Sequence, residues 1–197
     1  MTGLDEKSET KPRVLIGKRV YLRPLAKDDL VHLRKWSEDA EIRGLIGEAA
    51  PMNHSDCDKF LEKVYADSSR EWFVVVIKES NRVIGEAGLL RMDPAWRATD
   101  VSVIIGEKEE WGKGYGTETI LLLLDRAFRQ LNFHRVAIGV VGFNDRALRF
   151  WEKAGFSREG IQRDGYYYER KHHDFVMMSI LDDEFRGLHA ADDHDDR

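Results

Sequence analysis

The amino-acid sequence predicts an α+β (mixed α/β) domain, in which a mixed sheet is packed between helices. Three observations predict this class: β-rich runs occur in both halves of the chain, helical segments separate several of them, and a long helical segment connects two buried runs as a crossover. We see no internal repeat. The expected organisation is one domain over residues 14–187, between a flexible leader, 1–13, and a disordered acidic tail, 188–197.

One strand and two helices are expected in the first third of the chain. Residues 19–23 alternate as a strand does, and the proline that follows ends the run. Helical spacing of apolar residues predicts a helix over 28–39. Ser55 and Asp58, three residues apart, resemble a capping box for a second helix. The stretch between these helices, 42–54, is typical of a loop.

The middle of the chain predicts a hairpin, a further strand and a long helix. Residues 72–77 and 83–90 form an antiparallel hairpin in this interpretation, and Asp93-Pro94 breaks its pairing. The next strand begins near Thr99 and is apolar and β-branched to residue 105. From Ile120 to residue 131 the apolar positions recur at helical spacing, with Glu118 expected to face outward.

The last third predicts a buried strand, a short helix and two final strands. Residues 136–141 are apolar and β-branched, which favours a covered strand. Asn144 or Asp145 caps a helix that ends at Gly155. The final strands are expected from residue 156 onward and over 175–181.

The composition excludes several classes of protein. A formal net charge of -5 argues against a nucleic-acid partner, which would favour a basic face. No apolar run approaches the roughly 18 residues of a membrane helix and no secretory leader is recognised, so we expect a cytoplasmic protein without a membrane partner. Cys57 is the only cysteine, so neither an intrachain disulfide nor a cysteine metal cluster is expected, and we predict no metal.

The most informative segment is WGKGYGT, between the buried strand and the long helix. Gly112, Gly114 and Gly116 carry no Cβ, so the backbone can turn tightly and its N–H groups can approach a bulky anion. The following helix adds unpaired donors and the positive end of its dipole. The spacing fits neither the dinucleotide-binding fingerprint nor Walker A, which requires Lys-Ser/Thr after its last glycine. The segment therefore predicts a phosphate cradle of another kind.

The segment WGKGYGT, together with NDRALRFWEKAGF at 144–156, resembles the acetyl-CoA-binding motifs of the GNAT superfamily of N-acetyltransferases. Trp111 occupies the place where the superfamily usually has Gln or Arg, and this variant looks most like the branch of the ribosomal-protein N-terminal alanine acetyltransferases. The resemblance spans residues 14–185. It implies a mostly antiparallel twisted sheet of about seven strands flanked by about four helices, with a V-shaped splay between two central parallel strands that admits the pantetheine arm.

The resemblance implies an enzyme that moves an acetyl group from acetyl-CoA to a primary amine by direct attack in a ternary complex. The acceptor is a small molecule or a protein N-terminus, and the region around 42–54 lines its side of the site. Loop amides would hold the diphosphate, assisted by Lys113 and Thr117, while Asn144 bonds the pantetheine arm or only caps its helix. The implied cofactor-binding residues are Ile104, Ile105, Gly106, Trp111, Gly112, Lys113, Gly114, Tyr115, Gly116, Thr117, Asn144 and Trp151.

Two carboxylates compete for the role of general base. An alkylamine has a pKa of about 10, so a proton must be removed before it attacks. Asp100 lies at the start of the strand where many GNAT enzymes place a glutamate, and it would act through water; alternatively it only ends a loop. Glu86 on the neighbouring strand is the second candidate, unless it faces outward. Water alone is the third possibility.

The groups that assist the leaving thiolate and the developing negative charge are less defined. The resemblance implies a backbone N–H donor near Ile104, where the strand bulges from its neighbour. Trp151 stands where many relatives have a tyrosine acid, and an indole N–H has no useful acidity. Tyr166, Tyr167 or Tyr168 is an alternative acid, although a thiol pKa of about 8.5 makes the thiolate a tolerable leaving group without one.

Two rivals and two open questions accompany this hypothesis. A non-catalytic acyl-CoA-binding module would bind coenzyme A without transfer, and a nucleotide-binding regulator would prefer ATP or NAD. The acceptor is not readable from the chain. A homodimer is possible.

Overall fold

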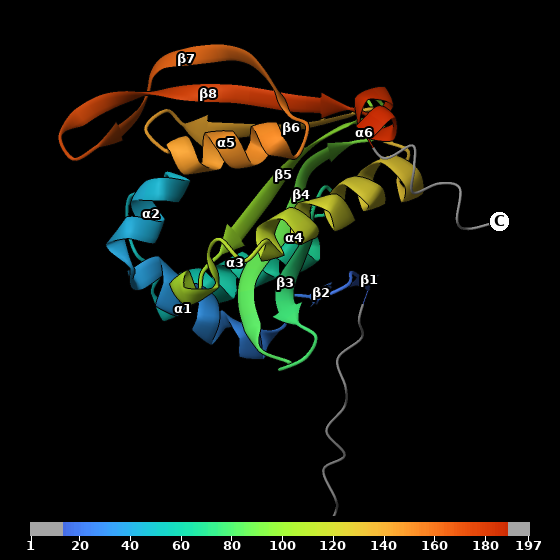
Figure 1. Cartoon of the computed structure of the whole chain (residues 1–197). Helices are drawn as coiled ribbons and strands as arrows, with labels where there is room; N and C mark the ends of the chain where they lie inside the picture. The colour runs from blue at the N-terminus through green and yellow to red at the C-terminus, as the bar shows by residue number, and fades with distance from the viewer. Residues whose placement is uncertain (1–13, 189–197) are drawn as a thin grey trace, which may run out of the picture.

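The structure of the protein, a computed structural model, describes residues 14–188. These residues form an eight-stranded sheet in the order β1-β2-β3-β4-β5-β6-β8-β7, with six α-helices packed around it (Figure 1). The predicted α+β class and mostly antiparallel sheet are confirmed. The counts exceed the expected seven strands and four helices because two short helices and a two-residue strand carried no recognisable pattern. The expected leader and the tail from residue 189 onward lie outside the described residues.

The first five strands form an antiparallel meander. β-branched and aromatic residues dominate β3 and β5, and six of the seven residues of β3 are buried, as expected for a central strand covered on both faces. The expected hairpin is confirmed, and β4 continues to the predicted break before Pro94. The bounds are β1, Leu15–Ile16; β2, Val20–Pro24; β3, Glu71–Ile77; β4, Val83–Asp93; and β5, Ala98–Ile105.

Helices α1, α2 and α3 cover one face of the meander, where Trp36, Leu61 and Trp72 share a buried cluster. Their bounds are Leu30–Glu38, Ala40–Ile46 and His54–Ala66. The expected loop over 42–54 is wrong at its start, because α2 occupies that stretch.

The caps explain both corrections in this region. Asp39 accepts hydrogen bonds from the N–H groups of Glu41 and Ile42, which starts α2, and Gly47 at φ 83° ends it. The capping box of α3 is formed by Asn53 and Asp56 rather than by Ser55 and Asp58, since the chain enters the helix two residues earlier than expected.

Helices α4, α5 and α6 cover the opposite face (Figure 1). Their bounds are Tyr115–Asp125, Asp145–Lys153 and Asp182–Leu188, and α4 continues into a π-helical turn, Arg126–Gln130. Ile120, Leu124 and Phe128 lie in the main core, as their spacing predicted. Glu118 does not face outward: its carboxylate accepts from the main-chain N–H of Arg19 at 2.6 Å and joins α4 to the first strands.

The sheet splits between its two parallel strands. β5 and β6, Arg135–Val141, pair only from Ala98/Arg135 to Asp100/Ala137 and then diverge (Figure 1). On the sides away from the gap both strands stay paired. β5 pairs with β4 as far as Ile105, and β6 pairs with β8, Lys171–Leu181, as far as Val141. The edge strand β7, Ser157–Tyr168, pairs with β8. The expected V-shaped splay is confirmed.

Candidate functional site

A cleft in two adjoining parts follows the gap between β5 and β6. Its outer part, at the glycine loop, has a volume of about 390 Å³, and its inner part, beneath α2 and α3, has a volume of about 270 Å³. The two parts adjoin, since six residues line both. The residues that line both are Leu45, Ile46, Val103, Ile104, Asn144 and Ala147.

The glycine loop leaves main-chain donors open toward the outer cleft. Gly112 and Gly114 have φ values of 76° and 85°, a conformation that L side chains rarely adopt. A Cβ at Gly116 would lie 3.4 Å from the ring of Phe150, so glycine at this position lets the main chain of the loop lie close to that ring. Gly114 is the N-cap of α4 and carries no side chain to accept from the first N–H groups of the helix. This arrangement suits an anionic diphosphate.

Trp111 bridges the two walls of the outer cleft. Its indole N–H donates a 2.6 Å hydrogen bond to the carbonyl oxygen of Ile105 at the end of β5. From the other wall, the guanidinium of Arg146 in α5 lies 3.7 Å from the indole ring centroid. The residue in the usual Gln/Arg place therefore acts here as an aromatic platform for a cation.

A row of cations on α5 completes the outer cleft. Arg146, Arg149 and Lys153 all line it, at positions i, i+3 and i+7 of one helix face. They suit the phosphate groups of coenzyme A. The sequence analysis missed this row, although the spacing was visible once the helix had been predicted.

Most of the expected cofactor residues line this cleft, and two do not. Gly106 packs under Trp36, where a Cβ would lie 2.1 Å from the indole ring, and the ammonium of Lys113 lies 2.9 Å from a carboxylate oxygen of Glu110. Trp151 lines the inner part only. Those that line the outer part are Ile104, Ile105, Trp111, Gly112, Gly114, Tyr115, Gly116, Thr117 and Asn144.

Asn144 is the N-cap of α5, and its side chain also spans the cleft. The amide oxygen accepts from the N–H of Ala147 at 3.0 Å, while the amide nitrogen donates to the carbonyl of Leu45 in α2, also at 3.0 Å. The helix cap is thus observed, and one amide hydrogen remains for a ligand in the cleft.

The strand β5 is not bulged where the resemblance implied. Its register with β4 is unbroken along residues 100–105, and the nearest shift lies between Leu90 and Asp93. The main chain near Ile104 is exposed to the cleft because β6 has diverged, not because β5 departs from β4.

The register also identifies which N–H groups face the gap. Gly106 donates to the carbonyl oxygen of Ile84 in β4 at 2.9 Å. Because successive residues of a strand point their main-chain groups to opposite neighbours, Ile104 points toward β4, and Val103 and Ile105 point toward the gap.

Glu86 lies in the inner cleft with a raised pKa. It lines the inner part and accepts a 2.7 Å hydrogen bond from the indole N–H of Trp72. Burial raises its pKa to about 7, against the opposing effect of the Trp72 bond, and the charge of Glu48 raises it further. Glu48 lines the same part, and burial raises its pKa as well. Glu86 therefore lines the cleft instead of facing bulk solvent, contrary to the alternative interpretation.

Asp100 lies elsewhere. Its carboxylate is ion-paired with Arg91, and it lines neither part of the cleft. The structure therefore does not bring Asp100 together with the glycine loop, whereas it does bring Glu86 into the space that the loop opens onto.

The inner cleft is otherwise largely apolar and aromatic. The sequence analysis did not anticipate Glu48 as a lining residue, although it lies in the segment that the resemblance assigned to the acceptor side. Other lining residues without an earlier signal are Leu33, Met52, Phe60, Trp72, Ser102 and Phe175.

Neither Trp151, in the place of the tyrosine acid, nor the three tyrosines offered as alternative acids lies beside the glycine loop. Trp151 is buried against Phe156 at a centroid distance of 4.9 Å. Tyr166 and Tyr168 stack at 5.9 Å, Tyr167 is exposed, and none of the three lines the cleft. Burial raises the pKa of Tyr166, whose hydroxyl has no hydrogen-bond partner within residues 14–188.

Two observations concern metal binding and membrane insertion. Within the described part of the chain, no group of three or more His, Cys, Asp or Glu side chains is arranged to hold a metal ion. No helix between residues 14 and 188 is long and apolar enough to cross a membrane.

Comparisons with known proteins agree with this geometry. Residues 19–157 match the family model of the acetyltransferase (GNAT) domain. A spermidine N(1)-acetyltransferase of Vibrio cholerae is 24% identical over 170 residues, covering 86% of this chain and 97% of the relative. "Putative ribosomal N-acetyltransferase YdaF" of Bacillus subtilis is 30% identical over 140 residues, covering 68% and 76%. The crystal structure of the Vibrio cholerae spermidine N-acetyltransferase with CoA and spermine superposes with a TM-score of 0.80 at 24% identity, covering 85% and 98%.

Proposed function

The chain belongs to the GNAT acetyltransferase family, and we propose that this acetyl-CoA-dependent N-acetyltransferase acts on a small aliphatic diamine or polyamine, with Glu86 as its general base. Acetyl-CoA supplies the acetyl thioester as co-substrate. The open amides at the start of α4 and the cations of α5 fit its phosphates. The observation that carries the choice of acceptor is the pair of carboxylates, Glu48 and Glu86, in one largely apolar pocket.

This pocket matches the chemistry of a diamine. The hydrocarbon chain of such a ligand packs on aromatic and aliphatic walls, and its ammonium groups pair with carboxylates. In the described part of the chain, neither Glu48 nor Glu86 has an ion pair within 4 Å, although the charge of Arg43 opposes the rise in the pKa of Glu48. Two carboxylates that share one pocket without a cationic partner favour a cationic ligand. The spermidine N(1)-acetyltransferase among the relatives supports the same acceptor class.

Glu86 is suited to remove the proton of the attacking amine. A base works best when its pKa lies near the working pH, and burial holds that of Glu86 at about 7. The indole of Trp72 fixes the orientation of the carboxylate. The N–H groups of Val103 and Ile105 face the gap and are placed to stabilise negative charge on the acyl oxygen. Asp100, paired with Arg91 outside the cleft, becomes the less favoured base.

A protein N-terminus is the second candidate acceptor. The relative described as a ribosomal N-acetyltransferase is 30% identical and favours it. A peptide would need to enter the same inner cleft. The non-catalytic module remains the rival of another class, and it predicts coenzyme A binding without transfer. The single domain over 14–187, the cytoplasmic location and the homodimer stay predictions.

A panel of acceptors tests the proposal. Thiol release from acetyl-CoA is measured with spermidine, putrescine, butylamine and an alanine-initiated peptide, using wild type, Glu86→Gln, Glu48→Gln and Asp100→Asn. Glu62→Gln, on the exposed side of α3, is the matched control. We expect turnover of the diamines and a loss of about 100-fold or more in kcat for Glu86→Gln. Glu48→Gln is expected to raise KM about tenfold for putrescine but not for butylamine.

The outcomes separate the alternatives. Turnover of the peptide alone would transfer the assignment to a protein N-terminus. Binding of coenzyme A without turnover of any amine would favour the non-catalytic module. Full activity in Glu86→Gln with loss in Asp100→Asn would return the base to Asp100. Intersecting initial-velocity lines are expected for direct attack in a ternary complex, whereas parallel lines would contradict it.

A further inference from the structure

Three glutamates stand directly before the diphosphate loop. Glu107, Glu109 and Glu110 occupy the turn between β5 and the glycines, and Glu110 lines the outer cleft itself. Glu107 and Glu110 are each 7% exposed. A buried carboxylate beside a bound diphosphate is unfavourable unless a cation neutralises it. The cations that do so therefore affect the affinity for coenzyme A.

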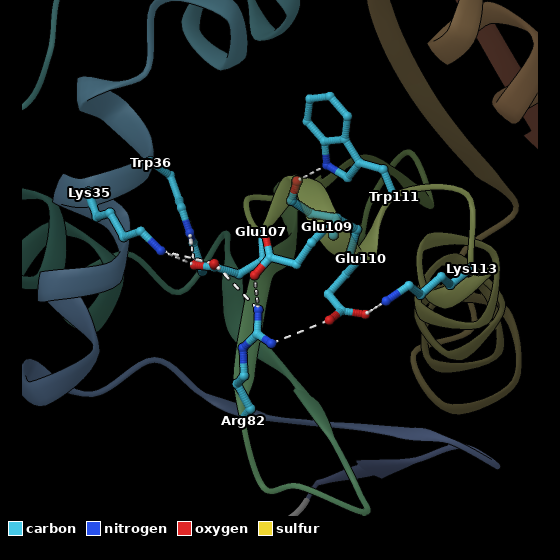
Figure 2. Close-up of polar contacts among 9 residues, drawn as sticks. Lys35, Trp36, Arg82, Glu107, Glu109, Glu110, Trp111 and Lys113 are labelled. Carbon is cyan, nitrogen blue, oxygen red and sulfur yellow. Dashed lines mark hydrogen bonds and ion pairs between the residues drawn. The ribbon is translucent and has the colours of Figure 1, made fainter.

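One arginine contacts all three carboxylates (Figure 2). The guanidinium of Arg82 lies 3.3 Å from Glu110 and 3.5 Å from Glu107, and it is closest to Glu109. Arg82 precedes β4, far from the loop in sequence, and lines neither part of the cleft. Arg82 therefore contacts the glutamate turn from outside the cleft.

Two lysines complete the network. Lys35 in α1 contacts Glu107 at 2.7 Å, and the indole N–H of Trp36 donates to the same carboxylate at 2.8 Å (Figure 2). Lys113 within the glycine loop contacts Glu110 at 2.9 Å. The formal charges of Arg82, Lys35 and Lys113 balance those of the three glutamates. Without Arg82 the network has one negative charge in excess.

Lys113 is the member whose role depends on Arg82. Its ammonium is the only cation of the glycine loop in the segment 111–117, and it already shares Glu110 with Arg82. If Arg82 is removed, Glu110 is left with Lys113 as its close cationic partner among the described residues. The ammonium, which already contacts this carboxylate at 2.9 Å, would then be held more strongly and would be released less readily to an incoming phosphate.

We propose that Arg82 is a positioning residue for acetyl-CoA: it neutralises the glutamate turn and weakens the hold of Glu110 on Lys113, so that the lysine can turn from this carboxylate to the diphosphate when the cofactor binds. It acts through Glu110 and Lys113 and touches no substrate. Its loss therefore weakens cofactor binding while leaving the acetyl-transfer step intact. This inference concerns binding of coenzyme A and holds whichever amine is the acceptor.

The test compares Arg82→Gln with Arg163→Gln, an exposed arginine of β7 outside the network. Titration calorimetry gives Kd for coenzyme A, and initial rates give KM for acetyl-CoA, KM for the amine and kcat. We expect Kd and KM for acetyl-CoA to rise about tenfold in Arg82→Gln, with kcat and KM for the amine within about twofold. The effect should shrink in 0.5 M NaCl, on the order of half, because salt screens the excess charge. Arg163→Gln should match wild type.

A second variant separates electrostatics from damage to the fold. Adding Glu110→Gln to Arg82→Gln removes the excess negative charge, so it should return Kd for coenzyme A to within about threefold of wild type. Glu110→Gln alone should bind coenzyme A at least as tightly as wild type, because it frees Lys113, and this holds even if Arg82→Gln fails to fold. An unchanged Kd in Arg82→Gln, a loss of kcat at constant KM, or weaker binding in Glu110→Gln would overturn the proposal.

Discussion

The indole N–H of Trp72 donates a 2.7 Å hydrogen bond to a carboxylate oxygen of Glu86 at the inner end of the cleft. The two residues lie on neighbouring strands, β3 and β4, on the face covered by α1 to α3. Burial favours the neutral form of Glu86, while this bond favours the charged form. The balance raises the pKa to about 7 and leaves an oriented carboxylate that accepts or releases a proton near neutral pH.

The raised pKa makes Glu86 destabilising to the fold at high pH. Its pKa rises from 4.5 to about 7 on folding, so the native state holds its proton more tightly than the unfolded state. The folded state is therefore more stable while Glu86 is protonated. This contribution is fully present below pH 4.5 and is lost as pH rises through about 7. Glu86→Gln cannot ionise, so we expect it to exceed wild type by up to about 3 kcal/mol at pH 8.

Urea unfolding at pH 5 and pH 8 measures this difference. The gain in Glu86→Gln should be larger at pH 8 than at pH 5, and Glu62→Gln should show no such trend. A variant that loses activity but gains stability identifies a strained functional group. Equal stability differences at both pH values would show that Glu86 has an ordinary pKa.

The glycine loop requires positive φ at two positions. Gly114→Ala introduces a side chain at φ 85° whose Cβ would lie 3.0 Å from the Arg19 guanidinium, so we expect Kd for coenzyme A to rise about tenfold or more. Gly160→Ala in β7 is the control, because its Cβ meets nothing within 4 Å and its φ is not positive. Calorimetric titration with coenzyme A checks both. Equal affinity in the two variants would mean that the loop is not the diphosphate site.

Asn144 combines a structural and a binding contribution that two variants separate. Asn144→Ala removes the cap of α5 and should cost about 1 kcal/mol in unfolding free energy as well as raising KM for acetyl-CoA. Asn144→Ser keeps a capping oxygen, so it should restore stability but not KM. Denaturation and steady-state kinetics on the same samples give both quantities. If Asn144→Ser restores both, the residue is only a helix cap.

A buried ion pair secures the start of α1. Arg23 contacts Asp29 through two bonds of 2.6 and 2.7 Å, and both residues are buried. Arg23→Met leaves a buried carboxylate without this partner and should cost about 3–5 kcal/mol. Arg34→Met breaks the exposed pair with Glu38 and should cost less than about 1 kcal/mol. Urea unfolding measures both, and similar costs would contradict the difference in burial.

Local patterns predicted the strands and the long helices because each of these elements is long enough for its apolar residues to repeat at the spacing of a strand or a helix. The β-branched residues of β3 and the helical spacing of α4 were sufficient. Helix α2 escaped because it has only seven residues, contains Gly44 and depends on the side chain of Asp39 for its start. Short helices are stabilised by tertiary packing, which a local pattern does not show.

The choice between two carboxylates depended on register. Asp100 and Glu86 face the same side of the sheet, but Glu86 pairs with Ile104 and Asp100 pairs with Leu90. Four residues of strand separate them, a distance of about 13 Å. Asp100 therefore lies where β5 and β6 are still paired, and Glu86 lies where they have diverged. The pairing between strands determines which carboxylate lies beside the gap, and the spacing of residues along a single strand does not reveal that pairing.

The pH dependence of turnover tests the role of Glu86 most directly. At saturating acetyl-CoA, kcat/KM for putrescine is measured for wild type and Glu86→Gln from pH 5.5 to 9. Deprotonation of the free amine affects both enzymes equally, so it cancels in their ratio. We predict that the ratio of wild type to variant falls about tenfold per pH unit below about pH 7 and is level above it. A ratio that stays constant across the range would contradict Glu86 as the general base.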